Sequence, residues 1–166
     1  LRAGTVTALH GANGSGKSTL LRVIAGLHPA TDGTVILAGA SMTDVPVHER
    51  VPTLGLVPQD GGRRLLCERV RDELADALHG LGGVERARRV DLVLRELDLT
   101  ALADAHPIDL SVGERERVAL GAVLTTEPRV ILLDEPTRGM DPVRRDQLAA
   151  LLRRRAAEGA CVLLAT

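Results

Sequence analysis

The residues from Gly11 to Thr19 combine glycines, a lysine and hydroxyl side chains in a pattern suited to binding phosphate groups. The run reads Gly-Ala-Asn-Gly-Ser-Gly-Lys-Ser-Thr and matches the spacing Gly-x-x-x-x-Gly-Lys-Ser/Thr. Glycines let the backbone wrap closely round an anion, and the N–H groups at a helix start then point toward it. Lys17 would add a mobile positive charge, and the Ser18 hydroxyl would be a hard oxygen ligand for Mg²⁺. The pattern therefore predicts a phosphate-binding loop made of Gly11, Asn13, Gly14, Ser15, Gly16, Lys17, Ser18 and Thr19.

An alternative interpretation of this stretch is a glycine-rich turn between a strand and a helix that binds nothing. The flanking segments count against this alternative, since Thr5–Leu9 is strand-like and Leu20–Ala25 is helix-like up to Gly26, which is the context expected of a phosphate-binding loop. The composition favours phosphate binding, because Lys17 is the only lysine among 21 basic Lys and Arg residues. A flexible ammonium thus occurs at the position where it suits a phosphate better than the planar arginine fork.

Two adjacent acids, Asp134 and Glu135, follow the continuous apolar run Val130–Leu133. Such a run is typical of a central parallel strand, and binding sites lie at the carboxyl ends of parallel strands. Asp134 could therefore hold the Mg²⁺ shell, while Glu135 could orient an attacking water or accept its proton. The alternative is a pair of exposed acids where a strand leaves the sheet, and the phosphate-binding loop makes this alternative the weaker one.

The segment from Ser111 to Glu114 opens a predicted helix and has two interpretations. In a capping box, the Ser111 and Glu114 side chains satisfy each other's backbone N–H groups. In a second anion site, the hydroxyl, a glycine N–H at Gly113 and the positive helix end would face a phosphate. The residue types alone do not separate these interpretations, and the two are compatible with each other.

The order of predicted elements indicates an α/β fold with a mostly parallel sheet flanked by helices. Further strands are expected at Thr34–Ala38, Leu54–Val57 and Cys161–Ala165, with Gly39–Pro52 mostly loop and a helix at about 142–158. A helical pattern runs from Val70 to Leu97 with apolar positions that include Val84 and Ala87, and a second helix is expected at about 111–125. Residues 62–127 are therefore predicted to form a helical subdomain inserted into one domain that spans 1–166.

Composition and charge limit the classes of function. The chain has 166 residues, 45% of them hydrophobic, with no Phe, Trp or Tyr for stacking a base. The net charge of -1 gives no electrostatic reason to expect nucleic acid, and clustered arginines such as Arg153–Arg155 are expected on a solvated helix face. Two distant cysteines and five histidines without ligand spacing predict neither a disulfide framework nor a zinc site. We also expect neither a membrane-spanning segment nor a signal peptide.

The motifs in this order resemble those of the ATP-binding cassette ATPases. The resemblance rests on the loop Gly11–Thr19, the glutamine Gln59, the signature Leu110-Ser-Val-Gly-Glu114, the strand and acids 130–135, and Gly139-Met-Asp141. Within that family, Val70-Arg-Asp-Glu-Leu74, Gly113-Glu-Arg-Glu-Arg117 and Glu135-Pro-Thr-Arg-Gly-Met-Asp141 are most similar to the energy-coupling-factor ATPases of cobalt and vitamin importers. Val112 and Glu114 depart from the commonest signature, Leu-Ser-Gly-Gly-Gln.

The resemblance implies an ATPase whose cofactors are ATP and Mg²⁺. Lys17, Ser18 and Thr19 would bind one ATP, Ser18, Gln59 and Asp134 would complete the Mg²⁺ shell, and Glu135 would act on the water. Ser111, Gly113 and Glu114 would approach the nucleotide of a second cassette, and Asp141 would lie at the interface between the two.

A transmembrane subunit would carry a small solute and hold the ATPase at the cytoplasmic face of the membrane, without nucleic acid. The alternative is a cassette ATPase of DNA repair or translation, although the short interval between Gln59 and Ser111 lacks the long coiled coil of repair members. An adenine-stacking aromatic residue and a histidine after the last strand are also expected from the family. Both would lie outside this chain, because the domain is expected to be truncated at both ends.

Overall fold

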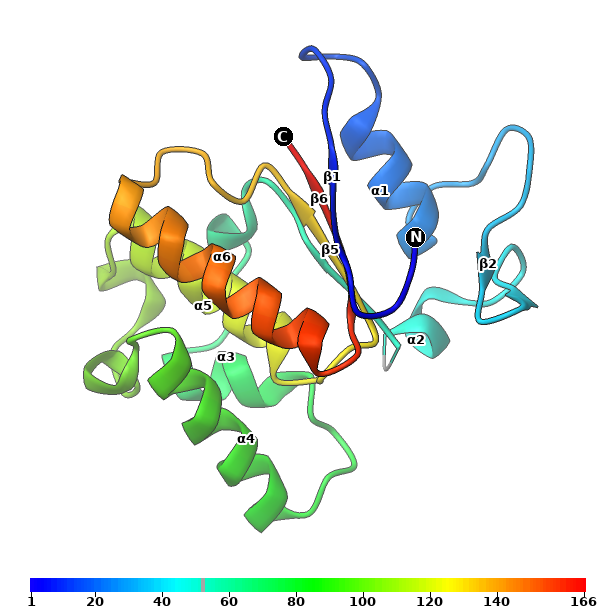
Figure 1. Ribbon diagram of the computed structural model, residues 1–166. Helices are drawn as coiled ribbons and strands as arrows, with labels where there is room; N and C mark the ends of the chain where they lie inside the picture. Colours follow the sequence, from blue (N-terminus) through cyan, green and yellow to red (C-terminus); the bar gives the residue numbers. More distant parts are fainter. Residues whose placement is uncertain (52) are drawn as a thin grey trace. The chain divides into compact units, whose positions relative to one another are not determined.

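The computed structural model describes residues 1–51 and 53–166 (Figure 1). The chain divides into two compact units. The first unit contains Leu1–Gln59 and Pro128–Thr166, and the second contains Asp60–Glu127. The first unit is therefore built from two stretches of sequence that the second unit separates.

A parallel sheet forms the centre of the first unit. In the described part of the chain it has four strands, β1 (Val6–Leu9), β4 (Leu54–Val57), β5 (Val130–Asp134) and β6 (Cys161–Ala165), in the order β1-β6-β5-β4. All five residues of β5 are buried, as expected for a strand that has a parallel neighbour on each side. The prediction of an α/β fold with a mainly parallel sheet is confirmed.

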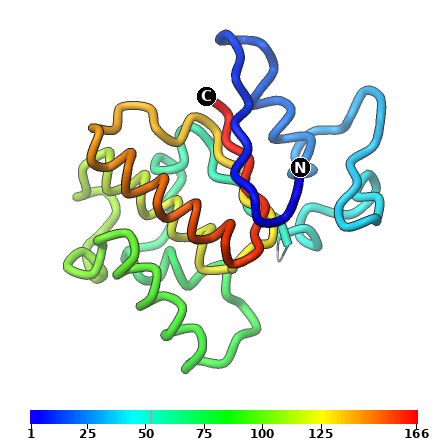
Figure 2. The backbone as a smooth tube through the Cα atoms, viewed as in Figure 1, coloured from blue at the N-terminus to red at the C-terminus, as the bar shows by residue number. Residues whose placement is uncertain are grey.

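Two long helices of the first unit cover the sheet. Helix α1 (Lys17–Ala25) packs on β4 and β5, and α6 (Pro142–Ala157) packs on β1 and β6. Figure 1 shows these two helices on opposite sides of the sheet. The smoothed chain in Figure 2 follows β1 into the loop that begins α1. A short helix, α2 (Val47–Arg50), lies between the first helix and β4 in the sequence.

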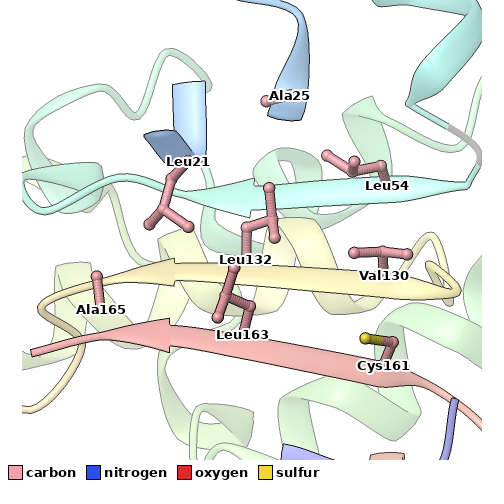
Figure 3. Packing of buried hydrophobic residues seen from close by; sticks show 8 residues of the cluster. All are labelled: Leu21, Ala25, Leu54, Val130, Leu132, Cys161, Leu163 and Ala165. Carbon is pink, nitrogen blue, oxygen red and sulfur yellow. The ribbon is translucent and has the colours of Figure 1, made fainter. Parts of the chain in front are cut away.

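The core between α1 and the sheet is entirely aliphatic apart from one cysteine. Leu132 at the centre of β5 is completely buried, and its register neighbours are Leu56 on β4 and Leu163 on β6. Figure 3 shows how the side chains of this cluster pack together: Leu21, Ala25, Leu54, Val130, Leu132, Cys161, Leu163 and Ala165. Branched aliphatic side chains thus fill the core of a chain that has no aromatic residue.

The second unit consists of helices. They are η1 (Gly61–Arg63), α3 (Val70–Asp76), α4 (Gly83–Glu96), η2 (Thr100–Leu102), η3 (Pro107–Asp109) and α5 (Val112–Leu124). Helix α5 packs against α3 and α4 at Gly121, where an added Cβ would lie 3.1 Å from Leu97 and 3.2 Å from Val93. A glycine here lets the helices approach closely. Within the described ranges, no helix has both the length and the apolar character needed to cross a bilayer.

The strand predicted at Thr34–Ala38 is present but shorter, and it belongs to a small antiparallel hairpin. Strand β2 (Ile36–Leu37) pairs with β3 (Ala40–Ser41), and the two residues between them, Ala38 and Gly39, have φ values of 49° and 84°. Consecutive positive φ values are the geometry of the tight turns that join adjacent strands. The predicted loop at 39–52 accordingly contains β3 and α2, while Pro52 lies outside the described residues.

The helical pattern from Val70 to Leu97 is divided into two helices. Helix α3 ends at Asp76 and α4 begins at Gly83, with Gly80 between them at a φ of 94°. The expectation that Val84 and Ala87 lie on the apolar face was wrong, because both are exposed and Val84 retains 89% of its accessible surface. The glycines between α3 and α4 end one helix before the next begins, so a single apolar face does not run through both helices.

The burial of Leu132 at the centre of β5 leads to a prediction about stability. Replacing Leu132→Ala should lower the free energy of unfolding by about 2–5 kcal/mol, because the substitution leaves a cavity in the packed core between the sheet and α1, where the paired strands cannot easily move to fill it. Urea unfolding followed by circular dichroism measures this change. The matched control is Leu66→Ala, whose side chain is 91% exposed and whose loss should change stability by less than about 0.5 kcal/mol. Equal effects of the two substitutions would contradict the assignment of the core.

Candidate functional site

The loop between β1 and α1 has the backbone geometry of an anion cradle. Gly14 and Gly16 have φ values of 81° and 90°, and neither has an atom within 4 Å of where a Cβ would be. Gly16 is the residue that caps the start of α1, so the first N–H groups of that helix follow it directly. At Gly11, in contrast, a Cβ would lie 2.6 Å from the Ser15 hydroxyl oxygen. The glycines thus keep the loop tight and leave its N–H groups accessible.

The only lysine of the chain lies against this loop. Lys17 is 9% exposed, and its Nζ donates hydrogen bonds to the carbonyl oxygens of Gly11 at 2.7 Å and Ala12 at 3.2 Å. The ammonium is therefore held beside the backbone that would surround a phosphate. A lysine adds a compact positive charge to such a loop, whereas an arginine would bring a larger planar group.

A hydrogen bond joins the start of α1 to the end of β5. The Ser18 hydroxyl donates to Asp134 Oδ1 over 3.0 Å, and Asp134 is only 5% exposed. The predicted Mg²⁺ ligands Ser18 and Asp134 are thus in direct contact. Hydroxyl and carboxylate oxygens are the hard ligands that Mg²⁺ prefers, so the donor set fits this ion.

Glu135 meets Gln59 at the carboxyl ends of two neighbouring strands. Because Val57 of β4 pairs with Leu133 of β5, the residues two positions further along are Gln59 and Glu135. The Gln59 Nε2 donates to Glu135 Oε2 over 3.1 Å, and the Glu135 N–H donates to the Ala165 carbonyl oxygen over 3.0 Å. The parallel register therefore brings together two residues that lie far apart in the sequence.

A cavity of about 460 Å³ connects these groups. Its volume lies in the range of small-molecule binding sites, and its lining is mostly polar, as a polyphosphate requires. The lining residues are Asn13, Gly14, Gly16, Lys17, Ser18, Thr19, Gln59, Glu135 and Arg138. Gly11, Ser15 and Asp134 lie outside the lining. The Gly11 carbonyl oxygen accepts from Lys17, the Ser15 hydroxyl oxygen lies close to Gly11, and Asp134 accepts from Ser18.

Arg138 is the lining residue that sequence reasoning missed. It lies three positions after Glu135 and is exposed. The available signal was its place within the short segment Glu135-Pro-Thr-Arg138, where it brings a charged side chain close to the predicted catalytic acid.

The residues from Ser111 to Glu114 form the predicted capping box in the second unit. Glu114 Oε2 accepts from the Ser111 N–H at 2.8 Å and from the Ser111 hydroxyl at 2.6 Å. The Glu114 N–H in turn donates to Ser111 Oγ over 3.3 Å. Gly113 lies in the first turn of α5, and a Cβ added to it would meet no atom within 4 Å. The capping interpretation is thus confirmed, and the anion interpretation stays a prediction.

Asp141 caps the start of α6 in the first unit. Its Oδ1 accepts from the Arg144 N–H over 3.0 Å, and its Oδ2 lies 3.9 Å from Arg144 Nε. Pro142 follows at the first helical position, which is favourable because proline has no N–H to satisfy there. The expected place of Asp141 at an interface between cassettes stays a prediction.

The two cysteines have thiols that are poor nucleophiles at neutral pH. Burial and the nearby Glu73 carboxylate raise the pKa of Cys67 to about 11. Burial also raises the pKa of Cys161. Because the thiolate is the reactive form, neither residue is suited to covalent chemistry.

Comparison with known proteins identifies the family. Residues 1–138 match the family model described as ABC transporter, and this match covers most of the chain. The chain belongs to the ABC transporter family of ATP-binding proteins. A relative from Streptomyces avermitilis, named as an ABC transporter ATP-binding protein, is 43% identical over 98% of this chain. Another with that name, from Clostridium tetani, is 31% identical over 100%. This ABC chain spans only 29% and 38% of the lengths of these two relatives.

Solved structures share the fold of this ABC chain. The dimeric ATP-binding cassette MJ0796, in a post-hydrolysis state bound to ADP and Pi, gives a TM-score of 0.87 at 29% identity and covers 98% of this chain and 75% of its own. CbiO1 from Clostridium perfringens, described as part of the ABC transporter complex cbiONQ, gives 0.85 at 32% identity, with coverages of 99% and 67%.

The capping box allows a test that needs no nucleotide. Ser111→Ala should lower the free energy of unfolding by about 1 kcal/mol, because the Glu114 N–H loses its acceptor at the start of α5. Ser111→Thr should retain most of the stability, since a hydroxyl remains at the cap position. Thermal unfolding of both variants would measure the difference. Equal stability of Ser111→Ala and the parent would show that the capping box is not formed in solution.

Proposed function

We propose that this protein hydrolyses ATP in the presence of Mg²⁺ and thereby powers transport of a small solute through separate membrane subunits. The observation that carries the proposal is the cavity in which Glu135 shares a lining with Lys17 and Ser18. A carboxylate, a cation and a helix start converging on one space suit the cleavage of a phosphate ester or anhydride. Membership in the ABC family supports ATP as the substrate.

The loop residues would bind and position the phosphates of ATP. The N–H groups after Gly14 and Gly16 would donate to phosphate oxygens, and the positive end of α1 would favour their negative charge. Lys17 would exchange its hydrogen bonds to the loop carbonyls for contacts to the β- and γ-phosphates. Thr19, which also lines the cavity, would add a hydroxyl contact.

Ser18, Gln59 and Asp134 would hold Mg²⁺ together with the phosphates. Bound Mg²⁺ supplies charge neutralisation of the phosphate oxygens. Asp134 would act mainly by fixing the Ser18 hydroxyl, because its carboxylate is buried and hydrogen-bonded to that group. The Gln59 amide would orient its oxygen through the hydrogen bond that its Nε2 donates to Glu135.

Glu135 would position the attacking water and accept its proton. The carboxylate keeps one oxygen, Oε2, bonded to Gln59, so the other oxygen can accept from a water in the cavity. The backbone of Glu135 is held to β6 through its bond to the Ala165 carbonyl oxygen. This arrangement would keep the base in place while the substrate binds.

A second cassette would complete the ATPase. Residues 62–127 would be the helical subdomain of the present cassette. Its residues Ser111, Gly113 and Glu114 would face the nucleotide bound by the second cassette, and Asp141 would lie at the interface between the two. The MJ0796 cassette is dimeric in its post-hydrolysis state, which supports this assembly. The second cassette would be an identical chain, a related chain or a tandem copy in the same chain.

We further propose an energy-coupling-factor type of transporter for cobalt or vitamins. The motifs at 70–74, 113–117 and 135–141 carry this proposal. The place of CbiO1 in the cbiONQ complex supports it. The ATPase would then work at the cytoplasmic face of the membrane, bound to its membrane subunit.

The role of Glu135 can be tested by Glu135→Gln in the full-length protein with its partner subunits. The variant should bind ATP about as tightly as the parent, because the amide keeps the shape and a polar contact to Gln59, while its turnover should fall by roughly 10²–10⁴-fold. Phosphate release measures turnover, and equilibrium dialysis measures binding. Glu158→Gln is the matched control, since this exposed carboxylate lies at the end of α6 and should leave both quantities unchanged. Turnover near the parental rate in Glu135→Gln would reject the assignment.

A further inference from the structure

The cavity contains a second cation besides Lys17. Its ionisable lining residues are Lys17, Glu135 and Arg138. Without Arg138, the charge of Lys17 would be cancelled by Glu135 and the lining would be neutral. Because ATP with one Mg²⁺ still carries about two negative charges at neutral pH, a neutral lining would attract it weakly. Arg138 therefore gives the lining its net positive charge, and it offsets the carboxylate of Asp134, which lies outside the lining but is bonded to Ser18.

The backbone places Arg138 beside Glu135. The Arg138 N–H donates to the Glu135 carbonyl oxygen over 3.2 Å, which closes a turn of four residues. A second turn follows at once, with the Met140 N–H bonded to the Thr137 carbonyl oxygen over 3.2 Å and Gly139 at a φ of 71°. Arg138 and Glu135 thus enter the cavity from the same segment after β5, whereas Lys17 enters from the loop before α1.

The Arg138 guanidinium is available for a ligand. Among residues 1–51 and 53–166, no hydrogen bond or ion pair is found for this side chain. Some other arginines of the same unit are engaged, since Arg50 donates to several backbone carbonyl oxygens and Arg144 pairs with Asp141. An exposed arginine with five donors and no acceptor is suited to a phosphate group, which can accept two parallel hydrogen bonds.

We propose that Arg138 binds the terminal phosphate and makes the site prefer a nucleoside triphosphate to a diphosphate. The inference rests on the proposed function, because Glu135 must lie near the phosphate that is cleaved. That phosphate is the terminal one, and the turn that links the two residues brings Arg138 to the same end of the bound chain. The loop and Lys17 would still bind the phosphates that the two nucleotides share, so the loss of Arg138 affects mainly the ligand that has the third phosphate.

The test compares two nucleotides in the full-length protein. Arg138→Ala should weaken binding of a non-hydrolysable ATP analogue with Mg²⁺ by about tenfold, and binding of ADP with Mg²⁺ by less than about twofold. Arg138→Lys should recover part of the loss, since it restores the charge without the planar fork. Isothermal titration calorimetry at two salt concentrations gives both affinities. The analogue's affinity should depend less on salt in Arg138→Ala than in the parent, because one charge contact is gone.

A matched control is Arg153→Ala, which removes an exposed arginine from α6, outside the cavity lining. It should leave both affinities unchanged. Equal weakening of the two nucleotides in Arg138→Ala, or no weakening of either, would overturn the inference. A change confined to subunit association, with the ratio of the two affinities preserved, would also overturn it.

The failure of this inference is distinguishable from a failure of the proposed function. Lys17→Ala should abolish binding of both nucleotides if the loop binds phosphates at all. If the parent protein binds neither nucleotide, both the ATPase proposal and the Arg138 assignment are rejected. If the parent binds both nucleotides, Lys17→Ala binds neither and Arg138→Ala matches the parent, the ATPase proposal stands and the Arg138 assignment is wrong.

Discussion

The hydrogen bond from the Ser18 hydroxyl to the buried Asp134 carboxylate connects the two sequence segments that make the site. A carboxylate that is 5% exposed is costly to bury without a donor, so the start of α1 is held against the end of β5. This contact fixes the orientation of the loop, because the loop ends where α1 begins at Lys17. It also aligns the loop with the strand that carries Glu135. This polar contact at the edge of an otherwise aliphatic core therefore helps to position the groups that line the cavity.

The backbone at Glu135 adds a second constraint. Its φ of 48° is left-handed, which costs a non-glycine residue roughly 1–2 kcal/mol. The conformation persists because the Glu135 N–H is bonded to the Ala165 carbonyl oxygen and the next turn closes onto the Glu135 carbonyl oxygen. The chain thereby leaves the sheet abruptly after Asp134. Both Glu135 and Arg138 reach the cavity as a consequence.

Local patterns were sufficient to predict the loop at 11–19 and the strand at 130–134, because glycine spacing and a continuous apolar run are visible in a single segment. The pairing of Gln59 with Glu135 required the register of β4 on β5, and the residues alone gave no reason to place them together. The resemblance to the ABC family supplied that role for Gln59. Arg138 was missed because its direction depends on two consecutive turns, one of which needs the positive φ of Gly139. Hydrophobic periodicity wrongly predicted that Val84 is buried, because Gly80 changes the direction of the chain before α4 begins.

The capping box in the second unit restricts how Ser111 can bind an anion. The Ser111 hydroxyl donates its single proton to Glu114 Oε2 at 2.6 Å, and the Ser111 N–H donates to the same oxygen at 2.8 Å. A phosphate near Ser111 would have to replace Glu114 as the acceptor of that proton, and the displaced carboxylate would then repel it unless it turned toward solvent. A glutamine at this position would carry no charge, so the same displacement would cost less. Glu114 therefore favours the capped state of α5 and lowers the affinity of the start of this helix for an anion.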